Sequence, residues 1–431
     1  MSAILALPIE AVRVLAPVYG IAAVLVVALL LPVPGVRGRL RVWWPIALAA
    51  AGLGALLGSL AVWLVLDVQD VFGVPASEVI RAAAATAGAG VGLAVVNLVR
   101  TRWWRKVVAV IAIPAVLAAG GLMINRDVAY FPKLGDALGV TGASTLSLHH
   151  STVATVDLHQ WQPPTSMPAE GTVGTADIPG LVSHWNGRPA WVYEPPAART
   201  ADPPKLPVVI AFSGEPGGPS DLFIAGGLQA KLDAIARAHQ GVAPIVVVPD
   251  QLGSFRNNPM CLDSPMGHVA TYVTTDVRTW VLGHLPVSTS RKDWSVAGFS
   301  EGATCAVQFA AADPQIFGSF LAISPELAPV DHSVARTVRE AFHGSKAAYE
   351  AAQPIAVMRR TGTYHDTTGL YCVGARDARY GRMLPPLLAA SKQAGMTVQS
   401  TKLPGVAHNW NTGAAGFAWG LPKLAALLNL P

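Results

Sequence analysis

Charged side chains are scarce in this chain of 431 residues: they make up 13% of it, against about 25% in an average soluble domain. Hydrophobic residues make up 52%. This composition excludes a disordered chain and argues against one that is soluble along its whole length. The formal net charge is +5, so a nucleic-acid partner has to be considered until the excess is located.

The positive excess is confined to the first 125 residues. They hold nine basic and four acidic side chains, whereas residues 126–431 hold 22 of each kind. The larger part of the chain is therefore formally neutral, and no nucleic-acid partner is expected.

Four stretches of the N-terminal part contain no charged residue at all. Each has at or near the ~20 residues that an α-helix needs to cross a bilayer, and helices that are apolar on every side are not expected in water. We therefore predict a transmembrane region over residues 1–125, with four helices at about 14–36, 42–66, 82–99 and 107–125.

Acidic residues are missing from two of the three linkers between these helices. The first and third linkers carry Arg37, Arg39, Arg41, Arg100, Arg102, Arg105 and Lys106, while the middle linker carries Asp67, Asp70 and Glu78. Basic loops stay in the cytoplasm, so both termini and everything after Asn125 are expected outside it. The first run has no basic segment before it and is expected to be a retained helix rather than a cleaved signal peptide.

Cysteine is rare as well, with Cys261, Cys305 and Cys372 all in the second part. An odd number leaves at least one thiol without a partner in the chain; a Cys261–Cys305 disulfide and buried free thiols both stay open. Metal-binding spacings such as His-Glu-x-x-His are missing, so no metal or cofactor is expected. The pair His149 and His150 is interpreted as exposed and polar.

After a Pro-rich juxtamembrane connector at 126–170, apolar runs alternate with helical stretches over residues 171–431. This alternation is typical of a mostly parallel sheet with helices on both faces. The expected strands are Leu181–Tyr193, Pro207–Phe212, Pro244–Pro249, Trp294–Gly298, Ser319–Ile323, Gly369–Val373 and Thr397–Leu403. The expected helices are Ser220–His239, Gly267–Leu285, Gly302–Ala312, Ser333–His343, Tyr380–Ala394 and Gly416–Leu428.

The segment Gly298-Phe299-Ser300-Glu301-Gly302 lies between an expected strand and an expected helix. In the G-x-S-x-G pattern the serine occupies a strained strand-to-helix turn, where larger residues in place of the glycines would clash with neighbouring backbone. The helix N-terminus also favours the negative charge that develops during acyl transfer. Ser300 is therefore the candidate nucleophile.

A serine nucleophile needs a base and a group that orients the base, and in α/β-hydrolases these follow in the order Ser, acid, His. His408 follows the last expected strand and Asp377 the one before it, where open α/β sheets gather their sites. We predict a triad of Ser300, Asp377 and His408. The alternative acids are Glu326, Asp331 and Asp366.

Two backbone N–H groups are expected to stabilise the oxyanion. One belongs to Glu301, directly after the nucleophile, and the other to the loop Ser213–Gly218, where the Glu215 amide is the favoured donor. This loop is not a phosphate loop, because no Gly-Lys-Ser/Thr follows it.

These segments resemble the esterase D-like α/β-hydrolases, a group that includes the mycolyltransferases of the antigen 85 type. The resemblance covers about Gly171–Leu428 and is carried by Pro207–Gly218, by the Gly298–Gly302 elbow with Ala303-Thr304-Cys305-Ala306 after it, by Leu370–Gly374 and by His408-Asn409-Trp410. It implies an esterase or acyltransferase that works through Ser300, Asp377 and His408. Ser213-Gly214 stands where many relatives have His-Gly, and Glu301 where a small or apolar residue is common.

The sequence thus predicts a membrane-anchored serine esterase, multi-pass in a bacterial cell membrane, with an extracytoplasmic α/β-hydrolase domain. The expected partner is an ester, and the favoured class is amphipathic, such as an envelope lipid or aminoacyl-lipid ester. An acyltransferase of the mycolyltransferase type and a non-catalytic envelope assembly protein are the alternatives. Transport is disfavoured because the four apolar runs hold no ionisable residue.

Overall fold

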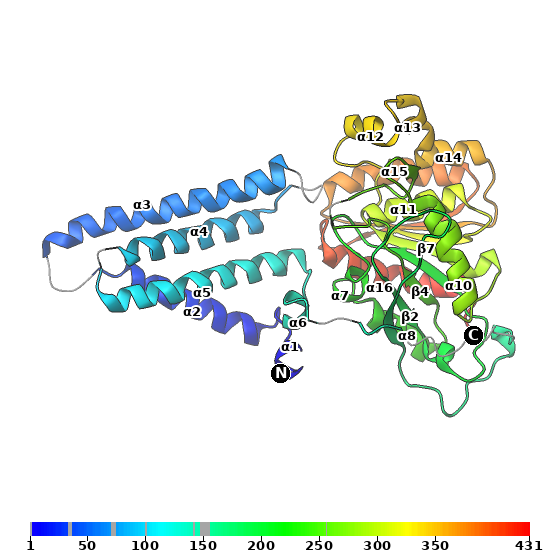
Figure 1. Cartoon of the computed structure of the whole chain (residues 1–431), viewed down its shortest axis with the longest axis horizontal. Helices are drawn as coiled ribbons and strands as arrows, with labels where there is room; N and C mark the ends of the chain where they lie inside the picture. The colour runs from blue at the N-terminus through cyan, green and yellow to red at the C-terminus, as the bar shows by residue number, and fades with distance from the viewer. Residues whose placement is uncertain are drawn as a thin grey trace. The chain divides into compact units, whose positions relative to one another are not determined.

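The computed structural model describes residues 2–32, 37–69, 75–99, 101–140, 143–146, 156–255 and 257–431. The chain divides into two compact units, Met1–Thr141 and Gly142–Pro431, here called the helical unit and the hydrolase unit (Figure 1). Asp70, Arg100, His149 and His150 lie outside the described residues.

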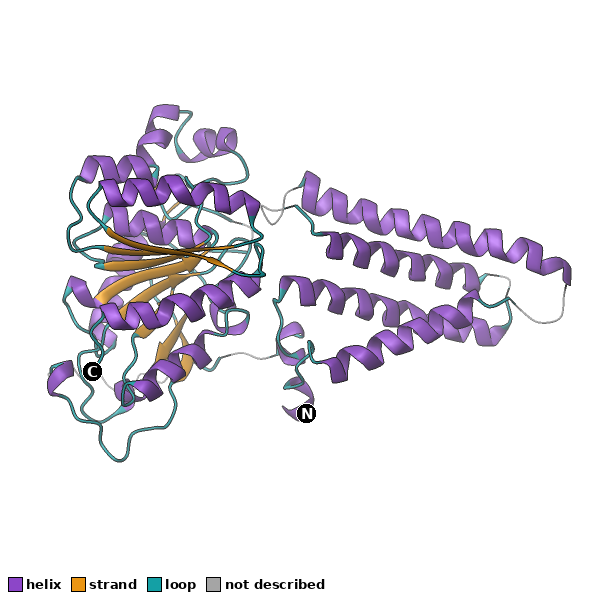
Figure 2. Cartoon of the chain, turned by 180° about the vertical axis from the view of Figure 1, so that it is seen from behind, coloured by secondary structure: helices purple, strands orange, loops and turns teal. Residues whose placement is uncertain are grey.

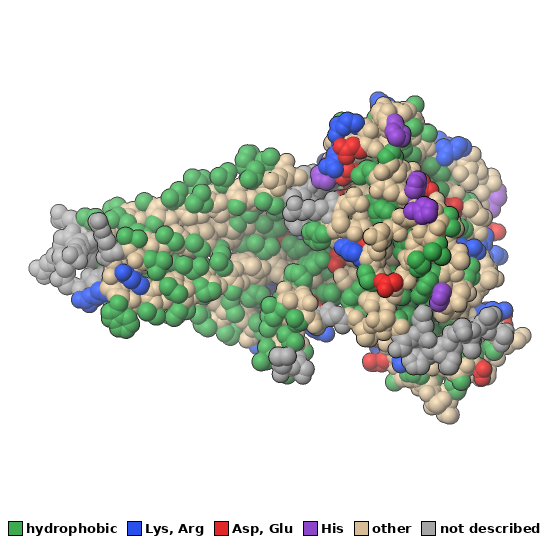
Figure 3. Space-filling view, in the orientation of Figure 1, with side chains coloured by type: hydrophobic (Ala, Val, Ile, Leu, Met, Phe, Trp, Pro, Cys, Tyr) green, Lys and Arg blue, Asp and Glu red, His purple; other side chains and the backbone are tan. Residues whose placement is uncertain are grey.

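The helical unit contains four helices that are long and apolar enough to cross a membrane, as the sequence predicts: α2 (Val12–Leu30), α3 (Arg37–Val62), α4 (Glu78–Leu98) and α5 (Trp103–Val128). A π-helical turn at Trp63–Val68 prolongs α3, and α1 (Ser2–Leu5) and α6 (Leu134–Ala137) are short. Hydrophobic side chains cover the visible face of this unit, whereas charged and histidine side chains gather on the hydrolase unit (Figure 3).

All four helices begin two to five residues earlier than the apolar runs that predicted them. Helix α3 begins at Arg37 and α5 at Trp103, so most of the basic residues expected in linkers belong to first turns of helices. The reason is that an apolar run marks the part of a helix that suits a bilayer, while arginine and lysine also favour helix.

Glycines let α3 and α4 pack backbone against backbone. A Cβ on Gly54 would overlap the carbonyl oxygen of Gly88, and a Cβ on Gly92 would overlap that of Ala50. Residues four apart share one face of a helix, so Gly54 with Gly58 and Gly88 with Gly92 form two smooth faces. Close contact of this kind is how helices associate without a hydrophobic driving force.

Arg105 is buried inside the helical unit, with 1% of its surface exposed. Its guanidinium donates to the carbonyls of Leu29 (2.5 Å) and Leu31 (2.7 Å) and to Asn97 Oδ1 (2.8 Å). The last carbonyls of a helix have no intrahelical partner and carry partial negative charge, so a cation stabilises them. The sequence placed Arg105 in a linker, but it ties α5 to the end of α2 and to α4.

The hydrolase unit is built on an eight-stranded sheet with helices on both faces (Figure 2). The strand order is β1-β2-β4-β3-β7-β8-β9-β10; the strands from β4 to β10 pair in parallel, and β1 and β2 are antiparallel at one edge. The strands are β1 (Thr172–Ala176), β2 (Ala190–Glu194), β3 (Val208–Phe212), β4 (Ile245–Val248), β7 (Trp294–Phe299), β8 (Ser319–Ile323), β9 (Thr368–Gly374) and β10 (Thr397–Leu403). This arrangement confirms the predicted α/β-hydrolase class.

The helices of this unit connect the parallel strands. They are α7 (Asp221–Ile224), α8 (Leu228–Ala238), α9 (Val269–Thr271), which continues through a π-helical turn at Tyr272–Val277 into α10 (Arg278–His284), α11 (Glu301–Ala312), α12 (Val334–Ala341), α13 (Lys346–Ala352), α14 (Pro354–Thr361), α15 (Ala378–Gln393) and α16 (Trp410–Leu427). A separate pair of two-residue strands, β5 (Asp263–Ser264) and β6 (Gly267–His268), precedes α9.

Several elements differ from the prediction. Helix α16 begins at Trp410 rather than Gly416, because Asn409 caps it, and α13 and α14 were not predicted. Strand β2 begins at Ala190 rather than Leu181, because Val182 and Ser183 turn their amides onto the Asp276 carboxylate at 2.9 and 3.0 Å. The helix expected over Ser220–His239 is broken into α7 and α8 at Gly227, whose φ is +57°. Strand β1 was not predicted, since it is a short edge strand interrupted by a glycine.

Candidate active site

Ser300 occupies the turn between β7 and α11 with φ +59°, in the left-handed region that is strained for any residue but glycine. A Cβ on Gly298 would overlap the Gly302 carbonyl, and a Cβ on Gly302 would overlap the carbonyl of Phe212. Both glycines of the elbow are thus required by close backbone approach. The turn presents the Ser300 side chain at the N-terminus of α11.

The structure brings Ser300, His408 and Asp377 together in one line of hydrogen bonds. Ser300 Oγ lies 2.8 Å from His408 Nε2, and His408 Nδ1 lies 2.9 Å from Asp377 Oδ2. Asp377 also caps α15 by accepting a hydrogen bond from the Tyr380 amide at 3.0 Å. This second bond fixes the carboxylate that faces the imidazole.

The other candidate acids have different surroundings. Asp331 pairs with His332 at 2.6 Å and with Arg336 at 3.0 Å, and Asp366 is exposed. The Glu326 amide donates to Thr304 Oγ1 at 3.0 Å, and burial raises the pKa of the Glu326 carboxyl to about 7.

His408 is packed between aromatic rings. The Tyr380 ring lies parallel to it at 3.8 Å between centroids, and the Phe299 ring lies at 5.2 Å. Burial lowers the pKa of His408 below its ordinary value of 6.5, although the hydrogen bond that His408 donates to Asp377 acts in the opposite direction. The imidazole is therefore neutral at pH 7, as a base that accepts the Ser300 proton must be.

The Glu301 side chain is fully buried beside the disulfide that joins Cys261 and Cys305. Its Oε1 lies 2.8 Å from Cys305 Sγ, and its Oε2 accepts a hydrogen bond from Gln251 at 3.1 Å. Burial raises the pKa of Glu301 to about 8. Since disulfide sulfurs have no proton to donate, the short oxygen–sulfur contact agrees with a protonated carboxyl.

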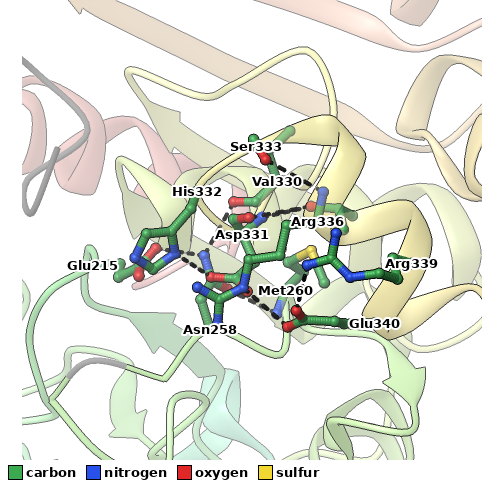
Figure 4. A network of polar contacts seen from close by, with 11 residues as sticks. Glu215, Asn258, Met260, Val330, Asp331, His332, Ser333, Arg336, Arg339 and Glu340 are labelled. Carbon is green, nitrogen blue, oxygen red and sulfur yellow. Dashed lines mark hydrogen bonds and ion pairs between the residues drawn. The ribbon is translucent and has the colours of Figure 1, made fainter. Parts of the chain in front are cut away.

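The predicted oxyanion loop lies at the nucleophile. A Cβ on Gly214 would lie 3.2 Å from Ser300 Cβ, and the Ser213 carbonyl accepts a hydrogen bond from Gln251 at 2.8 Å. The Glu215 side chain points away into a polar network that Figure 4 shows, where Asn258 donates to its Oε2 at 2.5 Å. These contacts hold the loop on both sides of the Gly214 backbone.

Two groups of potential metal ligands occur among the described residues. In the first, Cys261 and Cys305 are joined in the disulfide next to Glu301. In the second, Glu215, Asp331 and His332 come together, and Arg336 already supplies a positive charge 3.0 Å from Asp331 Oδ2 (Figure 4). Neither group is assigned a metal.

Sequence reasoning missed two polar residues of the site, Gln251 and Tyr380. Gln251 follows β4 and joins Ser213 to Glu301. Tyr380 stands three residues after Asp377. The only sequence signal for Tyr380 is its place in the first turn of the helix that Asp377 caps.

The residues of this site lie within a segment that matches a family of known proteins. The family model "Esterase" matches residues 188–420. An uncharacterized protein of Corynebacterium glutamicum is 30% identical over 319 residues, which is 71% of this chain and 74% of that protein. The chain belongs to the Esterase family.

Solved structures similar to this esterase include a ferulic acid esterase and an S-formylglutathione hydrolase from Agrobacterium tumefaciens. Both have a TM-score of 0.52. The ferulic acid esterase is 15% identical, and its alignment covers 60% of this chain and 99% of that protein. The S-formylglutathione hydrolase is 19% identical, and its alignment covers 61% of this chain and 98% of that protein. They share the fold of the hydrolase unit. The family and the fold together confirm the esterase D-like resemblance. They also confirm the prediction that this chain is a serine carboxylic ester hydrolase.

Proposed function

We propose that this esterase is anchored in a membrane and cleaves carboxylic esters with Ser300 as nucleophile, His408 as base and Asp377 as the group that orients the base. The observation that carries the proposal is the pair of hydrogen bonds Ser300 Oγ–His408 Nε2 and His408 Nδ1–Asp377 Oδ2, at 2.8 and 2.9 Å. No cofactor takes part in the proposed reaction.

In acylation, Ser300 Oγ bonds to the ester carbon while His408 takes the hydroxyl proton. Asp377 stabilises the imidazolium, and the amides of Glu301 and Glu215 donate to the oxyanion. The intermediate collapses as the alcohol leaves with the proton from His408. Water then enters, gives a proton to His408, and releases the acid together with a restored Ser300.

Four apolar helices and a disulfide support a place at the cell membrane with the hydrolase unit outside the cytoplasm. The helices have the length and composition of membrane spans. The Cys261–Cys305 disulfide agrees with an oxidising compartment, because the cytosol keeps thiols reduced.

An anchored enzyme meets esters of the same membrane at high local concentration. We therefore propose an envelope lipid ester, with aminoacyl-lipid esters as one class, as the substrate. The fold neighbours include a ferulic acid esterase and an S-formylglutathione hydrolase, both of which are hydrolases, so hydrolysis is favoured over transfer to an alcohol.

The direct test is labelling of the full chain in detergent with a fluorophosphonate probe. The expected result is stoichiometric labelling that Ser300→Ala abolishes. Ser295→Ala on the same strand, a buried serine paired with Ser319, is the matched control and keeps the label. Labelling that survives Ser300→Ala would overturn the assignment of the nucleophile.

Products and topology are tested separately. Release of free acid rather than an acylated alcohol from a radiolabelled lipid ester identifies hydrolysis. A tag after Pro431 is expected to be cut by external protease in intact cells, and protection of the tag would contradict the extracytoplasmic placement.

A further inference from the structure

Gln251 is a buried side chain to which the proposed reaction gives no part. It lies three residues after the end of β4, and none of its surface is exposed. Its amide nitrogen donates two hydrogen bonds, one to the Ser213 carbonyl at 2.8 Å and one to Glu301 Oε2 at 3.1 Å. A carbonyl oxygen can only accept, so the nitrogen of the Gln251 amide must be the atom that faces Ser213.

Both partners of Gln251 belong to the segments expected to bind the oxyanion. Glu301 supplies one of the two proposed backbone donors, and Ser213 begins the Ser213–Gly218 loop that supplies the other at Glu215. The two protons of one amide group lie in a plane at a fixed angle. A single NH₂ group therefore ties together the two halves of the proposed oxyanion hole.

The bond to Ser213 also orients the backbone that passes the nucleophile. A peptide group is planar, so the Ser213 carbonyl and the Gly214 N–H turn together. A Cβ on Gly214 would lie 3.2 Å from Ser300 Cβ, which shows how close this peptide comes to the serine. By holding the Ser213 carbonyl, Gln251 fixes the direction in which the loop continues toward Glu215.

The partners of Gln251 are also the two positions at which this chain departs from the pattern of its relatives. Ser213 stands where many of them have histidine, and Glu301 stands where a small or apolar residue is common. A small or apolar side chain after the nucleophile could not accept the second hydrogen bond from Gln251. The link between the two segments therefore depends on the glutamate of this chain.

The turn that carries Gln251 is itself firmly held. The buried carboxylate of Asp250 accepts hydrogen bonds from the backbone amides of Arg188 at 2.7 Å and of Leu252 at 3.1 Å. The Arg188 guanidinium pairs with the same carboxylate at 2.7 Å and donates to the Gly217 carbonyl at 2.9 Å. The residues on either side of Gln251 thus give its side chain a fixed base.

The oxygen of the Gln251 amide contributes nothing to the fold. Among the residues that the structure describes, Gln251 Oε1 has no hydrogen-bond partner. A buried amide oxygen without a partner lowers stability. The two bonds that Gln251 donates to the oxyanion segments are therefore what accounts for an amide at this place.

We propose that Gln251 is a positioning residue, which holds the Glu301 amide and the Ser213–Gly218 loop at the separation that an oxyanion requires. The proposal rests on the function proposed above for Ser300. In acylation and in deacylation alike, the carbonyl electron pair moves onto the oxygen and then returns. Gln251 neither gives nor takes a proton, and it supports both steps.

The first experiment measures hydrolysis of p-nitrophenyl butyrate by the full chain in detergent. Gln251→Met keeps the length of the side chain and removes both hydrogen bonds. We expect kcat and kcat/KM to fall together by about thirtyfold, because the lost stabilisation is confined to the transition state. An unchanged kcat in folded Gln251→Met would overturn the proposal.

Gln308→Met is the matched control. Gln308 is a buried glutamine on α11 that donates to the Met260 carbonyl at 3.1 Å, and its Oε1 also has no partner among the described residues. Its replacement removes a comparable buried amide without touching either oxyanion segment, so both kinetic constants are expected to stay as they are. Equal losses in Gln308→Met and Gln251→Met would show a general effect on the fold and contradict the proposal.

A second measurement reports on the oxyanion hole itself. An alkyl trifluoromethyl ketone adds to a serine nucleophile as a hemiketal, whose oxygen takes the place of the oxyanion. We expect its Ki to rise about thirtyfold in Gln251→Met, in step with the fall of kcat, and to be unchanged in Gln308→Met. A lower kcat in Gln251→Met without weaker inhibition would contradict the positioning role.

Glu301→Met tests the same link from its other end and does not depend on the folding of Gln251→Met. It keeps the backbone amide at position 301 and the bond from Gln251 to Ser213, but it removes the acceptor of the second bond. We expect kcat to fall about tenfold with a matching rise of the Ki of the ketone. An unchanged kcat would contradict a link between the two segments.

Fluorophosphonate labelling separates this proposal from the one on which it rests. If the native chain shows no Ser300-dependent labelling, the proposed function fails. If the native chain is labelled and hydrolyses the ester, while Gln251→Met keeps its kcat, only the role of Gln251 fails.

Discussion

The two units of the chain differ in whether their large hydrophobic side chains are exposed or buried. In the helical unit, Val24, Leu53 and Leu56 are 69%, 58% and 63% exposed, while glycines make the contacts between α3 and α4. In the hydrolase unit, Phe212 and Phe320 are fully buried. This difference is compatible with the proposed membrane placement of the helical unit, because hydrocarbon favours bulky groups outside and close backbones inside, and water favours the reverse.

They also bury ionisable groups of different kinds. The helical unit encloses Arg105, which backbone carbonyls at the end of α2 neutralise. The hydrolase unit encloses the carboxyls of Glu301 and Asp377, one beside a disulfide and the other against an imidazole. The buried Arg105 and the carboxyls of the candidate site thus lie in different units of one chain, and substitutions can test them separately.

The largest effect is expected at Asp377. Asp377→Asn should lower kcat/KM for p-nitrophenyl butyrate by about 10⁴, since the amide cannot hold the imidazolium in place. Asp331→Asn, which alters one of the alternative acids, is the control and should cost far less than a hundredfold. Helical content measured by circular dichroism should not change. A loss at Asp331 equal to that at Asp377 would mean that the acid has been misassigned.

A smaller effect is expected in the helical unit. Gly88→Leu should separate α3 from α4 and destabilise that unit by about 3 kcal/mol, because the new side chain meets the Gly54 backbone. Gly52→Leu on α3 is the control, since a Cβ there meets nothing within 4 Å. Thermal unfolding in detergent measures both variants. If they behaved alike, close packing of α3 on α4 would not be what stabilises the bundle.

The smallest effect is expected from the buried carboxyl of Glu301. Its pKa is about 8 in the folded chain and near 4.5 when exposed, so its contribution to stability is complete below pH 4.5 and is lost as the pH rises through 8. Glu301→Gln, which cannot ionise, should raise Tm by about 3 °C at pH 9 and change it little at pH 5. Calorimetry at the two pH values measures the difference. An equal change at both would show that Glu301 does not titrate in this range.

The sequence predicts the elements that local patterns determine. Strands β8 and β10 have their predicted bounds, because strands of a parallel sheet appear as short apolar or β-branched runs between turn signals. The elbow of Ser300 is recognisable because its two glycines stand at fixed positions on either side of the serine, although Gly302 is required by the distant carbonyl of Phe212. Both could be found without knowledge of the tertiary structure.

Other features depend on contacts between distant residues. Asp377 and three further acids all follow strands or loops near the site, and only the folded chain shows which one meets His408. Tyr380 and Gln251 reach the site because of how α15 and the turn after β4 are oriented. Hydrophobic periodicity in the sequence does not predict these orientations. From the sequence alone Arg105 is one of the charges of a linker, and only the folded chain shows that it contacts the end of α2.

Cys372 is buried in β9, and burial raises the pKa of its thiol. The other two cysteines are consumed in a disulfide, so the native chain offers maleimide reagents no accessible thiolate. A cysteine introduced by mutagenesis at any exposed position would be the sole site of modification, with no native cysteine to remove first. Impermeant reagents applied to intact cells could then map, residue by residue, which ends of the apolar helices face the outside.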